Sequence, residues 1–424
     1  MNEAYSALNT LPSRRESDAP RRARPARDTD RTLTPGALFA RVKPHFSAAG
    51  LTRVAEVTHL DRIGIPVALA VRPNSRSLSV SQGKGITRDQ AIASAVMEAM
   101  ELAAAERLPS GLHRASLQQM DRRDMLDLES STRSRLDRLP RDAEIHWAEG
   151  YEIGGYRRVM VPWALVGADY CAEAEGFHTA FQVSTDGLAS GASDDEAILH
   201  GLCELIERDA IALMTFMSTE ELATRAYPVD EEDGPDVVAM QRAIEGAGCT
   251  LNVIDMTSDI AVPAFTAIIS DPVTDGAHIT KYAHSGGSAC HPLRRRALEK
   301  AIVEAAQSRI TRISGSRDDL PASTYAAADD QDRQTMTGML SFARPGAQRR
   351  APVSIFGDTP EENVAILVER LKARGIEQAV AVPIANPFEI SVLRVIVPGL
   401  QTELTGQRSK LGRRALMKLV TRLQ

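Results

Sequence analysis

Three segments of the chain place acidic or amide side chains three residues apart among small apolar residues. The pairs are Glu98 and Glu101, Glu204 and Glu207, and Glu304 and Gln307. If these segments are helical, the members of each pair lie on one face, because residues three apart are neighbours on a helix surface. Two carboxylates on one turn repel each other, and burying them without a counter-charge is costly. The pattern therefore predicts a cation near these faces.

The types of the ligands indicate which cation this is. Candidate metal ligands are the glutamates of the pairs: Glu98, Glu101, Glu204, Glu207 and Glu304. Oxygen ligands without a His or Cys cluster favour Mg²⁺ or Ca²⁺ over zinc. Mg²⁺ often completes its coordination shell with phosphate oxygens, which points to a nucleoside triphosphate. The alternative is that each pair is a solvated helix face, although few lysines and polar residues surround them.

Basic side chains lie next to the same segments. In Gly83-Lys84-Gly85, backbone amides and the Lys84 ammonium can approach a phosphate, although the spacing of a full P-loop is missing. Arg208 and Arg309 each end one of the acidic or amide motifs, and a guanidinium binds phosphate in a bidentate manner. The alternative for both arginines is an ordinary salt bridge at the end of a helix.

Other residues near the motifs give weaker signals. Ser94 lies on the same predicted helical stripe as Glu98. His291 precedes a proline and is better explained as a turn or cap residue than as a catalyst. Cys203 and Cys290 adjoin the motifs, but buried cysteines are commonly inert, so a nucleophilic role is the less favoured reading. We assign no catalytic residue from the sequence.

The surrounding pattern predicts an α/β protein in which a strand, a glycine-bearing turn and a helix recur. The expected turns are residues 83–85, 185–191 and 285–288, and the helices that follow them are 88–107, 193–217 and a segment ending near 313. Further helices are expected at 36–49, 360–374 and 410–424. Alternating or β-branched patterns predict strands at 53–58, 66–72, 78–81, 145–152, 159–162, 250–255, 264–270, 280–283, 378–383 and 391–397.

Composition limits the class of protein. The chain has 424 residues, a net charge of -6 and 43% hydrophobic residues, which is typical of a globular enzyme and argues against a nucleic-acid binder or a membrane protein. Four cysteines without a CxxC pair indicate a reducing, cytoplasmic location. We expect a disordered Arg/Pro-rich tail at 1–33, one domain at 34–400 with surface insertions near 114–142 and 317–351, and a C-terminal helix within 401–424.

The three motifs together resemble the signature blocks of YcaO proteins. They read SxxxExxE at 94–101, TDGLASG followed by ExxER within 185–208, and ExxQSR at 304–309, and the resemblance extends over roughly 52–399. It implies a YcaO-type fold, with layered sheets and helices around a central ATP site. It also implies that the five glutamates hold Mg²⁺. The implied nucleotide contacts are Lys84, Ser94, Asp186, Arg208, Gln307 and Arg309.

The resemblance also implies a reaction. In YcaO proteins a nucleophile adds to a peptide amide carbon, the oxyanion attacks ATP, and loss of the phosphorylated oxygen leaves an azoline, an amidine or a thioamide. Two positions depart from the common pattern: Asp186 replaces the usual Asn, and Leu102 stands where an Arg often follows the second Glu. Asp186 adds negative charge beside the expected phosphate site.

The expected branch of the family is the one associated with TfuA. Residues 60–67, 71–75 and 395–400 look most like that branch, and the chain lacks the proline-rich C-terminus typical of azoline-forming enzymes. The resemblance therefore implies a peptide thioamide synthetase that receives sulfide from a TfuA-like partner and forms a homodimer. The alternatives are an azoline- or amidine-forming cyclodehydratase and a non-catalytic accessory protein that binds nucleotide or peptide.

Overall fold

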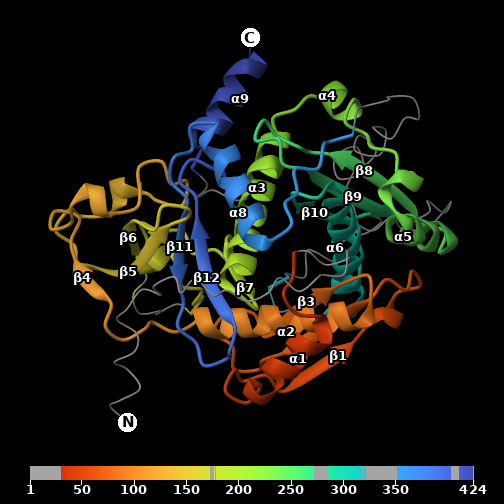
Figure 1. Ribbon diagram of the computed structural model, residues 1–424, viewed down its shortest axis with the longest axis horizontal. Helices are drawn as coiled ribbons and strands as arrows, with labels where there is room; N and C mark the ends of the chain where they lie inside the picture. The colour runs from red at the N-terminus through yellow and green to blue at the C-terminus, as the bar shows by residue number, and fades with distance from the viewer. Residues whose placement is uncertain are drawn as a thin grey trace.

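The structure is a computed structural model that describes residues 30–171, 176, 178–271, 284–317, 319–320, 351–402 and 410–423 (Figure 1). Its named strands pair antiparallel in three sheets. The first sheet has the order β1-β2-β3, formed by β1 (Arg53–Glu56), β2 (Val67–Val71) and β3 (Val80–Lys84). The second has the order β10-β9-β8, formed by β8 (Thr250–Asp255), β9 (Ala264–Ser270) and β10 (His284–Cys290).

The third sheet joins strands that are far apart in the sequence. Its order is β4-β5-β11-β12-β7, and β6 pairs with β5. The strands are β4 (His113–Ala115), β5 (Ile145–Glu152), β6 (Arg158–Pro162), β7 (Leu188–Gly191), β11 (Val380–Pro383) and β12 (Ser391–Ile396). In the register between β12 and β7, Arg394 lies opposite Leu188. The sheet thus places a C-terminal strand beside the turn that begins the second sequence motif.

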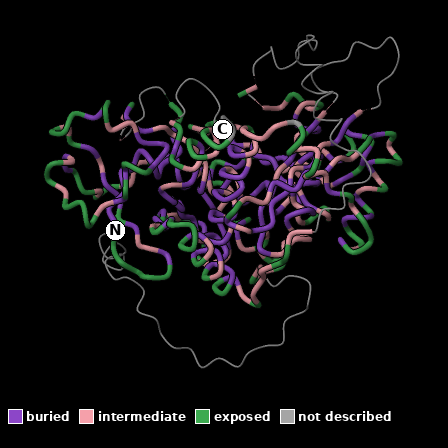
Figure 2. Tube along the Cα trace, turned by 90° about the horizontal axis from the view of Figure 1, so that it is seen from above, coloured by how far each residue is buried: buried purple, intermediate pink, exposed green. Residues whose placement is uncertain are grey.

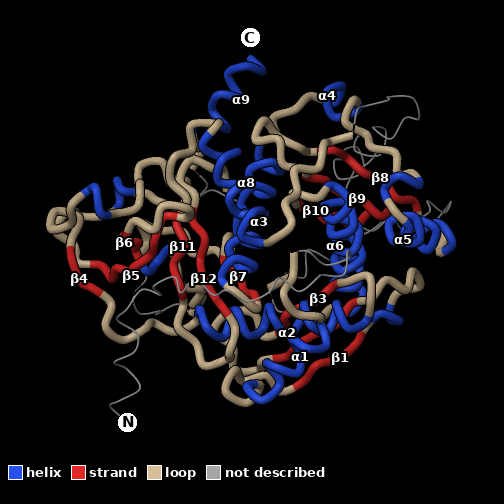
Figure 3. The backbone as a smooth tube through the Cα atoms, viewed as in Figure 1, coloured by secondary structure: helices blue, strands red, loops and turns tan. Residues whose placement is uncertain are grey.

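Helices separate and cover these sheets, which confirms the predicted α/β class. They are α1 (Pro35–Val42), α2 (Arg88–Ala105), α3 (Asp194–Met214), α4 (Thr219–Ala223), α5 (Pro235–Gly246), α6 (Arg294–Ser314), α8 (Pro360–Lys372) and α9 (Arg413–Leu423). Helix α3 stands between the third sheet and the second, contacting both β12 and β10 (Figure 3). None of the helices in the described part of the chain combines the length and apolar composition of a membrane span.

Capping signals in the sequence mark one end of each of the three long helices. Thr87 caps α2 in a capping box with Gln90, and the Ser193 side chain accepts a hydrogen bond from Glu196 N at the start of α3. Helix α6 ends at Gly315, whose left-handed backbone suits a C-terminal cap. The expected helices around the three motifs are therefore confirmed to within a few residues.

The predicted glycine turns are a partial misreading. Gly83 lies in β3, Gly191 in β7 and Gly287 in β10, so each motif helix follows a glycine-bearing strand. A Cβ on Gly83 would come within 2.0 Å of Ala95 N, and one on Gly287 within 2.1 Å of Ala305 N. The lack of a Cβ at these glycines therefore allows the strand to pack closely against the helix. Only 185–187 retains the predicted turn, with Gly187 at a φ of +74°.

Other expectations change in detail. The helix expected at 36–49 ends at Val42 and continues as a 3-10 turn, η2 (Lys43–His45). Short 3-10 turns η4 (Arg122–Asp124) and η5 (Leu136–Arg138) lie within 114–142, as expected of a connecting segment. The strand expected at 280–283 and most of the insertion at 317–351 lie outside the described residues. Helix α5 was not anticipated from the sequence.

Buried residues run through the middle of the molecule, where the tube is purple (Figure 2). One apolar cluster packs α2 against the first sheet, a second surrounds α3 and α8, and a third lies between α6 and the β8–β10 sheet. Asp30, in the last part of the expected tail, ion-pairs with Arg296 at 3.4 Å. Residues 1–29 of the expected tail lie outside the described residues.

Candidate nucleotide and magnesium site

Helices α2, α3 and α6 bring the predicted acidic residues into one cluster, which we call the glutamate cluster. Its members are Glu98, Glu101, Glu204, Glu207 and Glu304. Lys84, at the end of β3, places its Nζ 2.6 Å from Glu304 Oε2. Glu98 and Glu207 also act on the Lys84 ammonium through their charges. Residues 220 positions apart in the sequence thus share one electrostatic site.

The glutamate cluster holds more negative charge than the protein neutralises. Burial raises the pKa of Glu98 to about 7. Burial, followed by the charge of Glu304, raises the pKa of Glu207 to about 8. For Glu101, burial and then the charge of Glu204 raise the pKa well above its ordinary value. Carboxylates in this state favour binding either protons or a cation.

The donor set fits Mg²⁺ held together with phosphate. Among the described residues, no group of three or more His, Cys, Asp or Glu side chains lies close enough to hold a metal ion alone. Mg²⁺ commonly takes one or two carboxylates and completes its octahedron with water and phosphate oxygens, so a full protein cage is not required. Lys84 and Arg208 are the cations that would lie nearest to bound phosphates. The residues present therefore fit a magnesium-bound nucleoside triphosphate.

Arg208 connects the second motif to its preceding turn. Its guanidinium lies 3.3 Å from Glu207, 3.6 Å from Glu204 and 3.5 Å from Asp186. Burial opposes the charge of this guanidinium, but the surrounding carboxylates raise the pKa of Arg208. The salt bridges considered as an alternative from sequence exist, and they place Arg208 and Asp186 at the glutamate cluster.

Gln307 and Ser94 lie on the expected helical stripes. Gln307 Nε2 donates a hydrogen bond of 2.9 Å to the carbonyl of Gln82, which ties α6 to β3. Ser94 is half-buried on α2, one turn before Glu98. Each of the two residues therefore lies on the same helix as a glutamate of the cluster, about one turn away from it.

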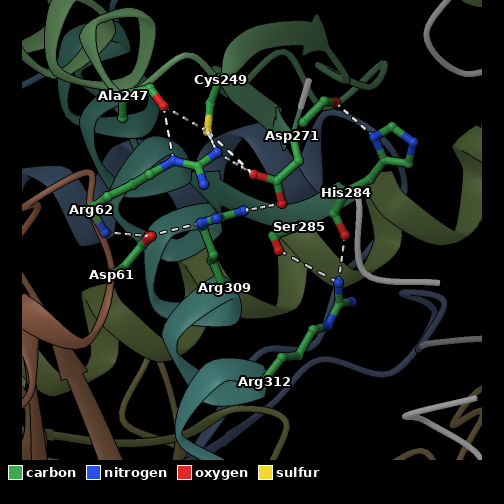
Figure 4. Close-up of polar contacts among 10 residues, drawn as sticks. Asp61, Arg62, Ala247, Cys249, Asp271, His284, Ser285, Arg309 and Arg312 are labelled. Carbon is green, nitrogen blue, oxygen red and sulfur yellow. Dashed lines mark hydrogen bonds and ion pairs between the residues drawn. The ribbon is translucent and has the colours of Figure 1, made fainter. Parts of the chain in front are cut away.

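Arg309 is placed differently from expectation (Figure 4). It lies two residues beyond Gln307, and 100° of rotation per residue directs it to the opposite face of α6. Its Nε donates to Asp61 at 2.8 Å and its Nη1 to Asp271 at 2.7 Å, and Arg62 joins the same Asp271. The structure thus places Arg309 in an ion-pair network that anchors α6, on a different face of the helix from Gln307.

The weaker candidates have structural roles. His291 is buried, and its Nδ1 accepts a hydrogen bond of 3.0 Å from the backbone amide of Leu293, as a turn residue does. Cys203 and Cys290 are both buried. Burial raises the pKa of the Cys290 thiol, which disfavours a thiolate. The preference for inert roles, formed from the sequence, therefore agrees with their placement.

Sequence reasoning missed Arg394. This residue is 0% exposed in β12, and burial lowers its pKa to about 9 despite the opposing charges of Glu204 and Asp186. The available signal was a single arginine within the apolar strand sequence Ser391–Ile396. A charged side chain at the centre of a buried strand is costly, so it indicates a specific function.

The raised pKa values predict an unusual pH dependence of stability. Because the folded pKa of Glu207 exceeds its unfolded value, this group stabilises the fold at low pH and the contribution is lost as pH rises through about 8. Burial lowers the pKa of His200 and His291, so their titration falls below this range. Between pH 6.5 and 8 we expect the free energy of unfolding of the nucleotide-free protein to fall, by up to about 1.4 kcal/mol per pH unit for each such carboxylate, and the melting temperature to fall with it.

Thermal melts with and without Mg²⁺ and a non-hydrolysable ATP analogue check this expectation. The bound cation favours ionised carboxylates, so the decline with pH should become shallower in its presence. A melting temperature that rises over the same range without ligand would contradict the raised pKa values.

Comparison with known proteins identifies the family. A family profile described as YcaO cyclodehydratase, ATP- and Mg²⁺-binding, matches residues 82–401. The chain belongs to the YcaO family. The matched region contains all three motif helices, and the family description agrees with the ATP and Mg²⁺ expected from the sequence.

Two curated relatives match most of the chain. A Rhizobium leguminosarum bv. trifolii protein named "Uncharacterized protein in tfuA 3'region" is 41% identical over 399 residues, which cover 91% of this chain and 92% of the relative. An uncharacterized protein of Methanothermobacter thermautotrophicus is 32% identical over 370 residues, which cover 84% of this chain and 91% of the relative. The first name agrees with the predicted TfuA-associated branch.

Solved structures share the fold. A heterocyclase in complex with substrate and cofactor aligns with a TM-score of 0.70 and 20% identity, over 91% of this chain and 54% of that one, so the present chain spans about half its length. YcaO from Methanopyrus kandleri, bound with AMPPCP and Mg²⁺, aligns with a TM-score of 0.64 and 22% identity, over 88% of this chain and 92% of that one. The expected YcaO-type fold is confirmed.

Proposed function

We propose that this protein uses ATP and Mg²⁺ to activate a backbone amide of a ribosomally made peptide and converts it to a thioamide. The observation that carries the ATP and Mg²⁺ part is the glutamate cluster, whose buried carboxylates have pKa values raised to about 7 and about 8 at Glu98 and Glu207. Such a site requires added positive charge to ionise fully. Membership of a family described as ATP- and Mg²⁺-binding supports the same assignment.

The roles of the residues follow from their charges. The glutamate cluster would hold Mg²⁺, and Lys84 and Arg208 would neutralise phosphate oxygens. Ser94, Asp186 and Gln307 would line the nucleotide site. Bound ATP supplies a phosphoryl group that turns the amide oxygen into a leaving group. The protein then acts mainly by positioning the reactants and neutralising charge, the usual strategy for phosphoryl transfer.

The thioamide product rests on the likeness to the TfuA-associated branch, supported by the relative named for its position in the tfuA 3′ region. Sulfide would add to the amide carbon, and the former carbonyl oxygen would leave on phosphate, giving a thioamide, ADP and phosphate. A TfuA-like partner would deliver the sulfide. We assign this chemistry to the domain at 34–400.

The test combines ATP, Mg²⁺, sulfide and a peptide encoded beside the gene, with and without a TfuA-like protein. Phosphate release and the peptide mass are measured together. The proposal expects ATP consumption and a mass gain equal to the difference between sulfur and oxygen. Loss of one water from the peptide would instead establish azoline formation. Failure to bind Mg²⁺ and nucleotide would overturn the enzymatic assignment.

A further inference from the structure

Arg394 is a fully buried arginine that bonds to backbone carbonyls. Its Nε and Nη2 donate to Val166 O at 2.9 and 2.8 Å, and its Nη1 donates to Asp186 O at 2.9 Å. Within the described residues it has no ion pair with a carboxylate. A buried guanidinium held only by carbonyls is costly, since charge-assisted pairing with an anion would be more favourable. This arrangement therefore suggests a role beyond stability.

One peptide group connects Arg394 to the glutamate cluster. The carbonyl of Asp186 accepts from Arg394, and the amide of Gly187, on the other side of the same peptide bond, donates to Glu204 Oε2 at 2.9 Å. The C=O and N–H of a trans peptide are fixed in one plane and point in opposite directions. Holding the carbonyl thus directs the amide at Glu204.

This peptide lies in a turn that needs an external restraint. Gly187 has a φ of +74°, and a Cβ there would come within 2.2 Å of Val395 O, so glycine is required. Glycine gives the backbone unusual freedom, including rotation of the adjoining peptide. Val395 N donates to Gly187 O at 2.7 Å and fixes one side of the turn. Arg394, the preceding residue of β12, fixes the other.

We infer that Arg394 is a positioning residue that holds Glu204 in place for Mg²⁺ through the Asp186–Gly187 peptide. The inference rests on the proposed function, because it assumes that the glutamate cluster binds Mg²⁺ with nucleotide. Groups that orient a metal ligand without touching the metal typically change affinity or activity by about 10–100-fold when altered. Arg394 has the position of such a group.

The experiment measures binding of a non-hydrolysable ATP analogue by calorimetry at a series of Mg²⁺ concentrations, using the full chain. In Arg394→Lys the charge remains, but one ammonium cannot span the carbonyls of Val166 and Asp186. We expect the Mg²⁺ concentration for half-maximal analogue binding to rise by about 10–100-fold. Binding of the analogue without Mg²⁺ should be unchanged.

Arg72→Lys is the matched control. Arg72 is also a buried arginine that donates to a backbone carbonyl, Ala49 O at 2.9 Å, but its carboxylate partner is Glu106, outside the glutamate cluster. This control should lose thermal stability while keeping the Mg²⁺ dependence of the wild type. Equal Mg²⁺ dependence in Arg394→Lys and Arg72→Lys would overturn the inference and leave Arg394 a structural residue.

A double-mutant cycle tests the route through Glu204. In a Glu204→Gln background, Arg394→Lys should add no further change to the Mg²⁺ dependence, since the two residues act in series. Additive effects would overturn the inference. The wild type separates the two hypotheses. If the wild type binds no analogue in the presence of Mg²⁺, the proposed function is wrong. If the wild type binds the analogue and Arg394→Lys has the same Mg²⁺ dependence, only the positioning role is wrong.

Discussion

Glu207→Gln is expected to lower ATP turnover by about 10²–10³-fold, the scale reported when one charge-stabilising group is removed from an active site. Glu207 is 8% exposed, pairs with Arg208 at 3.3 Å, and has its pKa raised to about 8 by burial. Glutamine keeps the shape of the side chain but lacks the negative charge that Mg²⁺ requires. Phosphate release at saturating peptide measures the loss.

The same substitution should stabilise the nucleotide-free protein at pH 8. Because burial disfavours the ionised form of Glu207, a neutral amide removes that cost. A higher melting temperature together with lost turnover would show that the lost activity does not come from misfolding. An active Glu207→Gln enzyme would contradict the assignment of this residue to the metal site.

Glu299→Gln is the control for a buried glutamate outside the glutamate cluster. Glu299 is 3% exposed on α6 and pairs with Arg296 at 3.2 Å. Burial raises the pKa of Glu299 as well, so a neutral amide removes the cost of its ionised form and stability should not fall. ATP turnover below the melting temperature should remain near that of the wild type. Equal losses of turnover in both variants would indicate a general effect of removing buried charge.

The glutamate cluster could be predicted because its signal is local. A spacing of three residues defines one face of a helix, and the scarcity of nearby lysines indicates burial. That three such faces meet in one site depends on the packing of α2, α3 and α6, which periodicity cannot provide. The order of the family motifs supplied this step. Sequence therefore identified the members of the glutamate cluster before any contact was known, and their part in binding Mg²⁺ stays a prediction.

Arg309 was assigned to the nucleotide site and Arg394 was missed, for opposite reasons. Arg309 ends a motif, but the helical rotation from Gln307 directs it toward Asp61 and Asp271. Its partners lie 248 and 38 residues away along the chain, so no local pattern could reveal them. Arg394 belongs to no spaced motif, and its role depends on the pairing of β12 with β7. Proximity to a motif is thus a weaker guide than the face on which a residue lies.

The connecting segment near 114–142 shows another limit of composition. Its high density of Arg and Asp predicts a surface, and Arg122 indeed lies exposed in a pair with Glu129. Leu126 and Leu128, however, are 1% and 2% exposed and belong to the same apolar cluster as α2. Two apolar residues among many charges are sufficient to fix a segment to the core, because each fully buried leucine contributes about 2 kcal/mol.

Glycine was misread because two different requirements select it. A tight turn needs positive φ, whereas a strand pressed against a helix needs the absence of a Cβ. Gly287 has the second requirement. A Cβ there would lie 2.1 Å from Ala305 N and 2.5 Å from Glu304 C, both backbone atoms of α6. No rotation of a side chain can relieve contacts with backbone.

Gly287→Ala is therefore expected to destabilise the protein by about 3 kcal/mol or more, at the upper end of the cost of overpacking a core. Helix α6 would have to move away from β10 and carry Glu304 with it. Urea unfolding measures the loss of stability. Calorimetry with Mg²⁺ and the ATP analogue should show weakened binding even where the variant is fully folded, since Glu304 would leave its place beside Lys84.

Gly286→Ala is a control one residue away on the same strand. A Cβ at Gly286 would have its nearest neighbour, Ala267 O, at 4.0 Å, because successive residues of a strand face opposite sides. Alanine should fit there with unchanged nucleotide binding and stability within about 1 kcal/mol of the wild type, since it also restricts the unfolded chain. If Gly287→Ala were as well tolerated as Gly286→Ala, α6 would not need close contact with β10, and the strand glycines of the other two motifs would need another explanation.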